Sequence, residues 1–379
     1  MQIGLQVRTF FMIIMTIAVS SCNQIRNITD VFVKPTAREL YAREFEKQDS
    51  LSYNKWHKEF LASKNDSLQI RLPYVEQGAY FKNRLVVYTY NLFLEEGVIF
   101  NIMINNEILG TRCFIDLLKL NEDGGLKDVM QNNYGENNLK FKIVESGVYK
   151  VLIQPELKSQ GLFSVEIYNT PSFGFPVLGK GNSAVQSFWG AARDGGARSH
   201  EGIDIFAERK TPVVAAVAGR VSSTGERGLG GKQVWLKAGL YGESLYYAHL
   251  DTILVSTGSK VEIGDTLGLV GNTGNARTTA PHLHFGIYKT GKGAINPLPF
   301  VKVTERLSFK PLSSMAKRSK ISSKVANIRN APTVSGTILG EIKQNDTVSL
   351  LGYTENWAHV QLKDGKGAFI YKGLISDID

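Results

Sequence analysis

Hydrophobic and polar residues alternate along long stretches of the chain, with a period of two that is typical of half-buried strands. The alternation is most regular between about residues 66 and 172, where turn-forming pairs such as Asn105-Asn106 and Ser146-Gly147 separate short runs. The apolar members of these runs are Leu68, Ile70 and Leu72; Phe100, Ile102 and Ile104; Leu139, Phe141 and Ile143; Tyr149, Val151 and Ile153; and Phe163, Val165 and Ile167. Many short alternating strands predict an antiparallel β-sandwich over residues 66–172.

The segment before this region has a different pattern. Leu40, Phe45, Trp56 and Phe60 are scattered through a charged stretch that follows Pro35-Thr36. Proline and threonine ahead of such a stretch are typical of a helix start. We therefore expect one or two amphipathic helices within residues 22–65, packed on the sandwich.

The C-terminal region, residues 321–379, contains five further strand signals. Its segment Asn327–Pro332 and its later Asp364–Ile370 resemble bacterial SH3-like domains, which implies a small β-barrel. Trp357 and His359 share one strand face. Two interpretations are open: a contact patch for cell-wall peptides, or a packed tryptophan beside a solvated histidine.

The first 21 residues are typical of an export signal. Arg8 supplies positive charge, and the apolar stretch from Phe10 to Val19 is too short for a permanent membrane span. The segment Val19–Cys22 resembles the lipobox of bacterial lipoproteins, which implies cleavage before Cys22 and lipid on that cysteine. An ordinary signal peptide is the alternative. Either way we expect a bacterial envelope protein, membrane-anchored if Cys22 is lipidated.

Composition and net charge limit the classes of binding partner that we expect. The chain has 379 residues, a formal net charge of +9 and two cysteines, Cys22 and Cys113. A disulfide framework is therefore excluded if Cys22 carries lipid, and Cys113, in phase with Ile115 and Leu117, is expected to be buried. Basic residues gather in a serine-rich linker, residues 304–320. Nucleic acid is a poor partner for an exported protein, so this linker either contacts an anionic envelope polymer or is simply solvated. We expect a monomer.

Four of the six histidines fall between residues 200 and 284. His282 and His284 are two residues apart, so a strand directs both imidazoles to one side. His200 and Asp204 are four apart, an even spacing that a strand or turn also places on one face. His249 lies between the two pairs. Converging imidazoles with a carboxylate are typical zinc ligands, so the sequence predicts a zinc site.

A run of short motifs gives the region 173–303 a specific resemblance to lysostaphin/LytM-type zinc endopeptidases. In chain order the motifs are Phe188-Trp189-Gly190, His200-Glu201-Gly202-Ile203-Asp204, Pro212–Ala216, Gly219-Arg220-Val221, Tyr247-Ala248-His249-Leu250, Gly264-Asp265, Gly271–Gly274 and Pro281-His282-Leu283-His284-Phe285. The resemblance implies that His200, Asp204 and His284 bind zinc and that His249 and His282 assist catalysis. Three protein ligands leave the fourth position open for a water.

The motifs depart from this family in a few places. Lys210 replaces a glycine that is common before the Thr-Pro-Val motif, Ala280 replaces the glycine before Pro281, and Gly286 stands where an acid is common. The loop 275–279 is slightly long. These changes affect expected specificity rather than metal binding.

The sequence therefore predicts a mostly β protein with six parts. These are a lipoprotein signal peptide (1–21), an anchor linker with amphipathic helices (22–65), a β-sandwich (66–172), an antiparallel zinc endopeptidase domain (173–303), a basic linker (304–320) and an SH3-like domain (321–379). The resemblance implies a zinc-dependent hydrolase of peptidoglycan peptides. Two alternatives are a catalytically silent envelope scaffold or activator of another cell-wall hydrolase, and a general secreted zinc protease for glycine-rich proteins.

Overall fold

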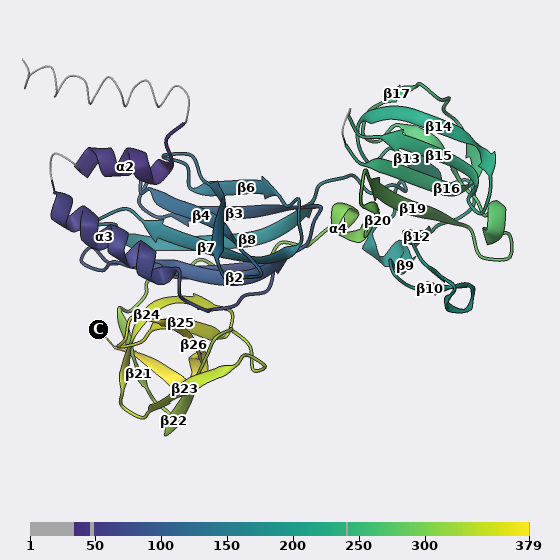
Figure 1. The fold of residues 1–379 in the computed structure, drawn as a ribbon. Coiled ribbons are helices and arrows are strands. Elements are labelled where there is room, and N and C mark those ends of the chain that lie inside the picture. Colours follow the sequence, from purple (N-terminus) through teal and green to yellow (C-terminus); the bar gives the residue numbers. More distant parts are fainter. Residues whose placement is uncertain (1–33, 46–48, 240–241, 379) are drawn as a thin grey trace, which may run out of the picture.

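The structure is a computed structural model that describes residues 34–45, 49–239 and 242–378. The predicted export signal and Cys22 lie outside the described residues. Within the described part, no helix has both the length and the hydrophobicity needed to cross a membrane. The fold is mostly β, as predicted, and consists of two helices, a sandwich, a second β domain and a C-terminal β domain (Figure 1).

Two N-terminal helices lie on the sandwich, as expected. They are α2 (Ala37–Phe45) and α3 (Ser50–Ser63). Asp49 accepts a hydrogen bond from the backbone N–H of Ser52 at 3.1 Å and so caps α3. Trp56 of α3 is buried, and its ring meets Phe114 of the sandwich at 5.2 Å. The apolar positions of these helices therefore pack on the next domain.

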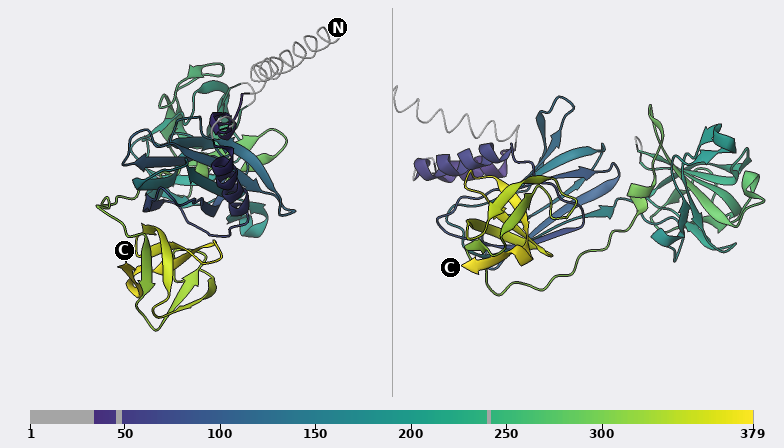
Figure 2. Two further views of the ribbon diagram at one scale, coloured as in Figure 1. Left: turned by 90° about the vertical axis from the view of Figure 1, so that its left-hand side faces the viewer. Right: turned by 90° about the horizontal axis from the view of Figure 1, so that it is seen from below.

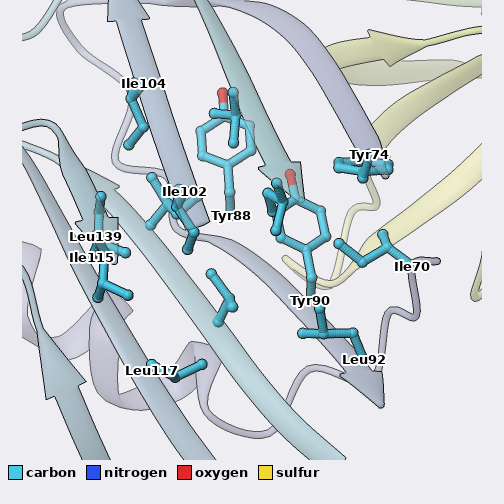
Figure 3. Packing of buried hydrophobic residues seen from close by; sticks show 14 of the residues in the cluster. Ile70, Tyr74, Tyr88, Tyr90, Leu92, Ile102, Ile104, Ile115, Leu117 and Leu139 are labelled. Carbon is cyan, nitrogen blue, oxygen red and sulfur yellow. The ribbon is translucent and has the colours of Figure 1, made fainter. Parts of the chain in front are cut away.

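The sandwich is made of two antiparallel sheets. One has the order β1 (Tyr74–Tyr80), β8 (Gly161–Pro171), β3 (Val98–Asn106) and β6 (Asn138–Lys142). The other has the order β2 (Tyr88–Leu94), β7 (Gly147–Pro155), β4 (Cys113–Leu120) and β5 (Leu126–Gln131). The alternating residues of both sheets form one core, part of which Figure 3 shows around Tyr88, Ile102 and Ile115. Cys113 is buried, as predicted.

Two strands of the sandwich differ from the predicted pattern. The alternation Leu68-Ile70-Leu72 does not form a strand of its own: Gln69 makes only an isolated bridge to Asn91. The first strand, β1, begins after it, at Tyr74. Strands β1 and β2 were not predicted. β1 is buried at all positions but one and shows no alternation, whereas β2 does alternate, with Tyr88, Tyr90, Leu92 and Leu94 buried.

The second β domain is built around one antiparallel sheet. The sheet order is β17 (Lys260–Val261), β14 (Gly219–Arg227), β15 (Gly231–Lys237), β16 (Ser244–Ile253), β19 (His282–Lys289), β12 (Ile203–Phe206) and β9 (Val185–Ser187). The same sheet includes β18 (Thr266–Val270), which pairs with β16, β13 (Pro212–Val214), which pairs with β18, and β20 (Gly293–Ile295), which pairs with β19. Outside it are the hairpin of β10 (Ala192–Arg193) and β11 (Arg198–Ser199), and helix α4 (Leu298–Val301). Short 3-10 turns are Asn182–Ala184, Asp194–Gly196, Gly274–Ala276 and Lys372–Leu374, the last in the C-terminal domain.

The C-terminal domain contains the five predicted strands and two more at its ends. The strands are β21 (Arg318–Ile321), β22 (Val325–Arg329), β23 (Ile338–Lys343), β24 (Thr347–Thr354), β25 (Trp357–Gln361), β26 (Gly367–Tyr371) and β27 (Ile375–Ile378). Among the described residues no pairing joins β23 to β27, so the sheet does not close into a barrel. Strand β21 begins at Arg318, inside the range expected for the linker.

The C-terminal domain and the sandwich share a sheet, which the sequence did not indicate. Strand β24 pairs with β1, with Gln77 opposite Tyr353 and Gly78 opposite Gly352. A Cβ on Gly78 would lie 2.4 Å from the carbonyl oxygen of Leu351, so this close approach requires glycine. Figures 1 and 2 show the C-terminal domain against the sandwich and away from the second β domain.

This contact overturns the contact patch and half of the other interpretation of Trp357 and His359. Trp357 is packed, at 7% exposed, but His359 is 2% exposed and so is not solvated. His359 instead pairs with the fully buried Glu76 of β1 at 2.9 Å. The face that these residues share is covered by the sandwich.

Candidate active site

Strand register brings Asp204 and His284 together. In the antiparallel pair of β12 and β19, Asp204 lies directly opposite His284, and Phe206 lies opposite His282. His200 precedes β12 and is not part of a strand; its backbone N–H donates to Ala191 O at 2.9 Å. The turn His200–Gly202 therefore folds back over the end of the strand pair and directs His200 at the same point.

The three predicted metal ligands form a small triangle. His200 Nε2 lies 3.0 Å from Asp204 Oδ1 and 3.0 Å from His284 Nδ1, and His284 Nδ1 lies 3.0 Å from Asp204 Oδ1. His200 and Asp204 are buried and His284 is partly buried. Ligand atoms on a tetrahedral zinc ion, with bonds of about 2.0–2.1 Å, lie about 3.3 Å apart. The triangle is smaller than this by only a few tenths of an ångström.

The hydrogen bonds around the triangle favour a cation. His200 Nδ1 lies 2.9 Å from Phe188 O, and because a carbonyl oxygen only accepts, Nδ1 carries the proton. In the neutral ring, Nε2 then holds a lone pair that faces another acceptor, Asp204 Oδ1. Two acceptors at this distance repel each other unless a proton or a metal ion lies between them. Two imidazole nitrogens and one carboxylate oxygen fit zinc.

The lack of a side chain at Gly202 leaves room for the ring of His284. A Cβ built on Gly202 would lie 2.6 Å from Phe285 O and 2.7 Å from Cε1 of His284. Any side chain at this position would therefore displace the His284 ring or the strand that carries it. The glycine in the sequence His200-Glu201-Gly202-Ile203-Asp204 is required by this contact.

The other oxygen of Asp204 binds an arginine that the sequence did not single out. Arg193 Nη2 donates to Asp204 Oδ2 at 2.8 Å and to Ser187 Oγ at 2.6 Å. Burial opposes ionisation of Asp204, but its contacts with His200 and His284 outweigh burial and hold the pKa of this carboxyl well below its usual range. Asp204 is thus a carboxylate with both oxygens engaged.

His249 and His282 lie beside the triangle. Their rings are 5.1 Å apart, and the His249 ring is 5.9 Å from that of His284. His249 Nδ1 donates to Thr273 O at 2.9 Å and His282 Nδ1 donates to Ala280 O at 2.8 Å, which leaves Nε2 of each ring as the nitrogen without the proton. Burial, followed by repulsion from His282 and His284, lowers the pKa of His249 to about 4. At neutral pH this ring is therefore a neutral proton acceptor.

The backbone of His249 is strained. Its φ is 61°, in the left-handed region that non-glycine residues rarely adopt. Its backbone N–H donates to Gly230 O at 2.8 Å, and its ring is held by Thr273. Contacts from two separate loops therefore maintain this conformation, which directs the imidazole to the site.

A groove of about 700 Å³ surrounds these residues. All of its lining residues come from the second β domain, between Ser187 and Tyr288; none of the described residues of the sandwich or the C-terminal domain takes part. Leu229, which is 54% exposed, and Asn275 belong to two loops that line the groove. Tyr246 and Tyr288 also line it, and Tyr246 lies edge-on to His284 at 5.8 Å.

The structure brings all five predicted site residues to this groove. Sequence reasoning missed Arg193, Thr273 and Tyr246. Thr273 contacts His249 through its backbone oxygen, which every residue type has, so the sequence does not indicate this contact. The only feature of the sequence that points to Arg193 is its position shortly before the His200–Asp204 motif. Tyr246 directly precedes the motif residue Tyr247 but is not itself part of that motif.

Residues 198–297 match the model of peptidase family M23, and residues 324–376 match the model of the bacterial SH3 domain. The chain therefore carries an M23 peptidase domain and a bacterial SH3 domain. The M23 domain contains the whole triangle and both additional histidines. Lys210, in place of the common glycine, has a φ of 72°, which explains why glycine is common there and how lysine is accommodated only with strain.

Two named peptidases match about a third of the chain. An L-Ala–D-Glu endopeptidase of Bacillus subtilis is 34% identical over 146 residues, which is 36% of this chain and 44% of that protein. A DD-carboxypeptidase/endopeptidase, Mpg, of Neisseria meningitidis is 34% identical over 140 residues, which is 36% of this chain and 31% of that protein. The chain thus spans less than half the length of each.

A longer match and a solved structure complete the comparison. An uncharacterized metalloprotease of Haemophilus influenzae is 27% identical over 254 residues, 64% of this chain and 48% of that protein. The catalytic domain of lysostaphin from Staphylococcus simulans is 32% identical, with a TM-score of 0.28 over 30% of this chain and 89% of that one.

Proposed function

We propose that the protein is a zinc-dependent endopeptidase that hydrolyses peptide cross-links of bacterial peptidoglycan. The observation that carries the proposal is the triangle of His200, Asp204 and His284, with two further histidines beside it in one groove. The peptidoglycan substrate is supported by a further relative, the peptidoglycan DD-endopeptidase ShyC of Vibrio cholerae, which is 36% identical over 97 residues. An M23 peptidase domain alone does not fix which bond is cut.

In this proposal His200, Asp204 and His284 would hold zinc. A bound zinc ion supplies a Lewis acid that lowers the pKa of a water to about 7 and polarises a carbonyl group. The chain's own contribution is the positioning of proton carriers. His249, neutral at neutral pH, accepts a proton through Nε2, and His282 presents a second Nε2 on the same side of the groove.

The groove also orients the substrate. Leu229, Asn275, Tyr246 and Tyr288, which line the groove, restrict how an extended peptide lies across the histidines. Burial of His200 and Asp204 strengthens the electrostatic contacts of the site. Together these contacts favour amide hydrolysis over simple peptide binding.

Digestion of purified cell-wall sacculi tests the proposal. Residues 23–379 are incubated with sacculi in the presence of zinc or of a chelator, and the released muropeptides are identified by mass spectrometry. We expect cross-linked products to be converted to shorter peptides with zinc only. His284→Ala serves as the matched variant, which loses zinc while the domain keeps its separate apolar core. Intact cross-links with zinc-loaded protein would refute the proposal.

A catalytically silent scaffold is a less favoured candidate, because such a protein has no need for three metal ligands and two placed histidines. A general protease for glycine-rich proteins is distinguished by the substrate. Cleavage of a glycine-rich polypeptide at a rate above that of sacculi would favour this second candidate.

We also propose that the protein is anchored to the cell envelope through lipid on Cys22. The lipobox-like segment Val19–Cys22 supports this, and stable anchoring requires more than one acyl chain. Cys22→Ala is expected to release the protein from membranes on fractionation. A Cys22→Ala variant that stays with the membrane after high-salt washing would contradict the proposal.

A further inference from the structure

The hairpin of β10 and β11 places a guanidinium behind one metal ligand. Arg193, on β10, is 33% exposed in its side chain, whereas the Asp204 side chain that it contacts is 10% exposed. The hairpin turn contains Asp194, Gly195 and Gly196, all with positive φ. The strand partner β11 leads directly to His200. The same hairpin thus carries both a ligand and the arginine.

The two oxygens of Asp204 have different partners. Oδ1 faces His200 Nε2 and His284 Nδ1, each at 3.0 Å, whereas Oδ2 accepts from Arg193 Nη2 at 2.8 Å. A carboxylate that is free to rotate exchanges its oxygens. One that is held on Oδ2 presents Oδ1 permanently to the metal position.

Ser187 extends the contact to a second ligand. Its Oγ accepts from Arg193 Nη2 at 2.6 Å and lies 3.4 Å from His200 Nδ1. Ser187 is on β9, which pairs with β12 at Asp204. Arg193 therefore joins the outer sides of two metal ligands through one nitrogen atom, an arrangement typical of residues that orient ligands without touching the metal.

We propose that Arg193 is a positioning residue that holds Asp204 in a one-oxygen binding orientation and so raises the affinity of the site for zinc. This inference rests on the proposed zinc site. It does not depend on the substrate. The guanidinium acts only through Asp204 and Ser187, and its role is separate from those of His249 and His282.

The positive charge of Arg193 and its orienting contact predict opposite effects on zinc affinity. The direction of the change therefore tests the proposal. Removal of a positive charge near a cation site would by itself strengthen zinc binding, since like charges repel. A variant that lacks Arg193 and binds zinc more weakly therefore reports lost orientation. Outer-sphere partners of metal ligands typically contribute about 10–100-fold in metal affinity.

The test measures the zinc dissociation constant by competition with a chromogenic chelator for residues 23–379. Arg193→Leu, which keeps the apolar stem and removes every donor, is expected to weaken zinc binding about 10–100-fold. Arg193→Lys keeps a charged donor and is expected to recover part of the affinity. Arg198→Leu is the matched control, because Arg198 lies opposite Arg193 in the hairpin but pairs with Asp194 at 2.6 Å and contacts no ligand.

A second readout is the visible absorption spectrum of the cobalt-substituted protein, which reports coordination geometry independently of activity. We expect Arg193→Leu to change this spectrum and Arg198→Leu to leave it unchanged. If Arg193→Leu fails to fold in the presence of chelator, the comparison of Arg193→Lys with Arg198→Leu carries the test, and Arg193→Lys is again expected to bind zinc more weakly than the control.

Three results would overturn the inference. These are zinc affinity of Arg193→Leu within about twofold of the parent, tighter zinc binding in that variant, or equal losses in the Arg193 and Arg198 variants. A raised KM for peptide with unchanged zinc affinity would make Arg193 a substrate contact instead. Failure of the proposed function would appear differently, as a parent protein that binds zinc normally but does not cleave sacculi.

Discussion

Single hydrogen bonds to backbone oxygens fix the orientation of three histidines in the candidate active site. His200 donates to Phe188 O, His249 to Thr273 O and His282 to Ala280 O, each through Nδ1. The free nitrogen of each ring is consequently Nε2. A site in which ring protons are assigned in this way needs no rearrangement before it binds a cation or accepts a proton.

Loss of His249 or His282 should separate metal binding from catalysis. We predict that His249→Ala and His282→Ala keep about one zinc per chain while turnover falls roughly 10²–10⁴-fold, the usual contribution of a positioned acid or base. Substrate affinity should change little, because the lost contact is made mainly in the transition state. Zinc content, melting temperature and turnover are measured together. Near-normal turnover would remove that residue from the mechanism, and lost zinc would make it a ligand.

Gly202 should be as sensitive as a ligand. Gly202→Ala introduces a Cβ 2.6 Å from Phe285 O and 2.7 Å from the His284 ring, so we predict loss of zinc binding without global unfolding. Gly181→Ala is the matched control in the same domain, because its Cβ would meet nothing within 4 Å. Zinc content by elemental analysis checks the pair. A Gly202→Ala protein with full zinc occupancy would show that His284 is not confined by this contact.

The five site residues could be predicted because their residue types recur at recognisable spacings. The residues that hold them in position could not be predicted in this way. The spacings His282–His284 and His200–Asp204 can be recognised in the sequence because each pair belongs to one short segment. Arg193 and Thr273 act through contacts with other strands and loops. Such contacts depend on the register of β12 with its neighbours, which no local pattern specifies.

Two glycine-containing loops, residues 228–231 and 273–276, hold His249 from opposite sides. Gly231 and Gly274 are in contact: a Cβ on Gly274 would lie 2.2 Å from Leu229 O and 2.5 Å from Gly231 N. Asn275 N–H donates to Leu229 O at 3.0 Å. The loop 228–231 is therefore one half of an interlocked pair that carries Gly230 O and Thr273 O to His249.

Separation of these loops should reduce activity and spare the metal. We predict that Gly274→Ala keeps zinc and loses turnover at least about tenfold, because Thr273 O moves away from His249 Nδ1. Gly228→Ala is the control, since Gly228 also has positive φ (55°) but a Cβ there would meet nothing within 4 Å. Turnover and zinc content are compared in both. Equal losses in the two variants would attribute the effect to backbone strain and not to loop contact.

Strands were predictable where apolar and polar residue types alternate in the sequence. β3, β7 and β8 contain such runs, although β7 is buried on both faces from Tyr149 onward, whereas β1 is buried nearly throughout and shows no alternation. The joint sheet formed by β1 and β24 could not be predicted, because its partners are far apart in the chain and each is an ordinary strand. Domain boundaries remain predictions from composition and motif.

In the whole molecule, the C-terminal domain is joined to the sandwich through buried polar contacts. Glu76 is fully buried, pairs with His359 at 2.9 Å, and accepts hydrogen bonds from the hydroxyls of Tyr74 and Tyr90. Tyr88 donates to Leu351 O at 3.2 Å. Figure 3 shows Tyr74, Tyr88 and Tyr90 in this core, with the C-terminal strands in yellow nearby. The sandwich and the C-terminal domain thus form one packed unit.

The M23 domain is attached to that unit separately. Phe300 of α4 packs on the backbone of Gly97, where a Cβ would lie 2.4 Å from its ring, and Lys289 pairs with Glu96. These contacts lie beside the start of β3. Among the described residues, only those of the second β domain line the groove.

Breakage of the Glu76–His359 pair should destabilise the packed unit. His359→Leu leaves a buried carboxylate without its partner, and we predict a loss of about 3–5 kcal/mol in its unfolding free energy. Glu341→Gln, on exposed strand β23, is the control. Denaturant unfolding is measured for the unit, with zinc content as a check that the M23 domain is intact. Unchanged unfolding free energy in His359→Leu would show that the pair contributes nothing.

Acid should weaken the same contact. Burial opposes ionisation of Glu76, but His359 and the tyrosine hydroxyls outweigh burial and hold the pKa of Glu76 below its ordinary value of 4.5. A depressed folded-state pKa means that the stabilisation is fully present above about pH 4.5 and is lost as pH falls through the folded pKa. We predict that melting temperature falls below pH 4.5 more steeply in the parent than in Glu76→Gln. Parallel curves would contradict this.

Stepwise addition of zinc to metal-stripped protein, residues 23–379, tests the central proposal most directly. Peptide cleavage in sacculi is followed by release of new amino groups at each zinc-to-protein ratio. We predict no cleavage without metal, a linear rise, and saturation at one zinc per chain, with His282→Ala binding the same single zinc but releasing almost nothing. Cleavage by the metal-free protein, or a parent protein that binds one zinc and releases no amino groups, would contradict the proposal.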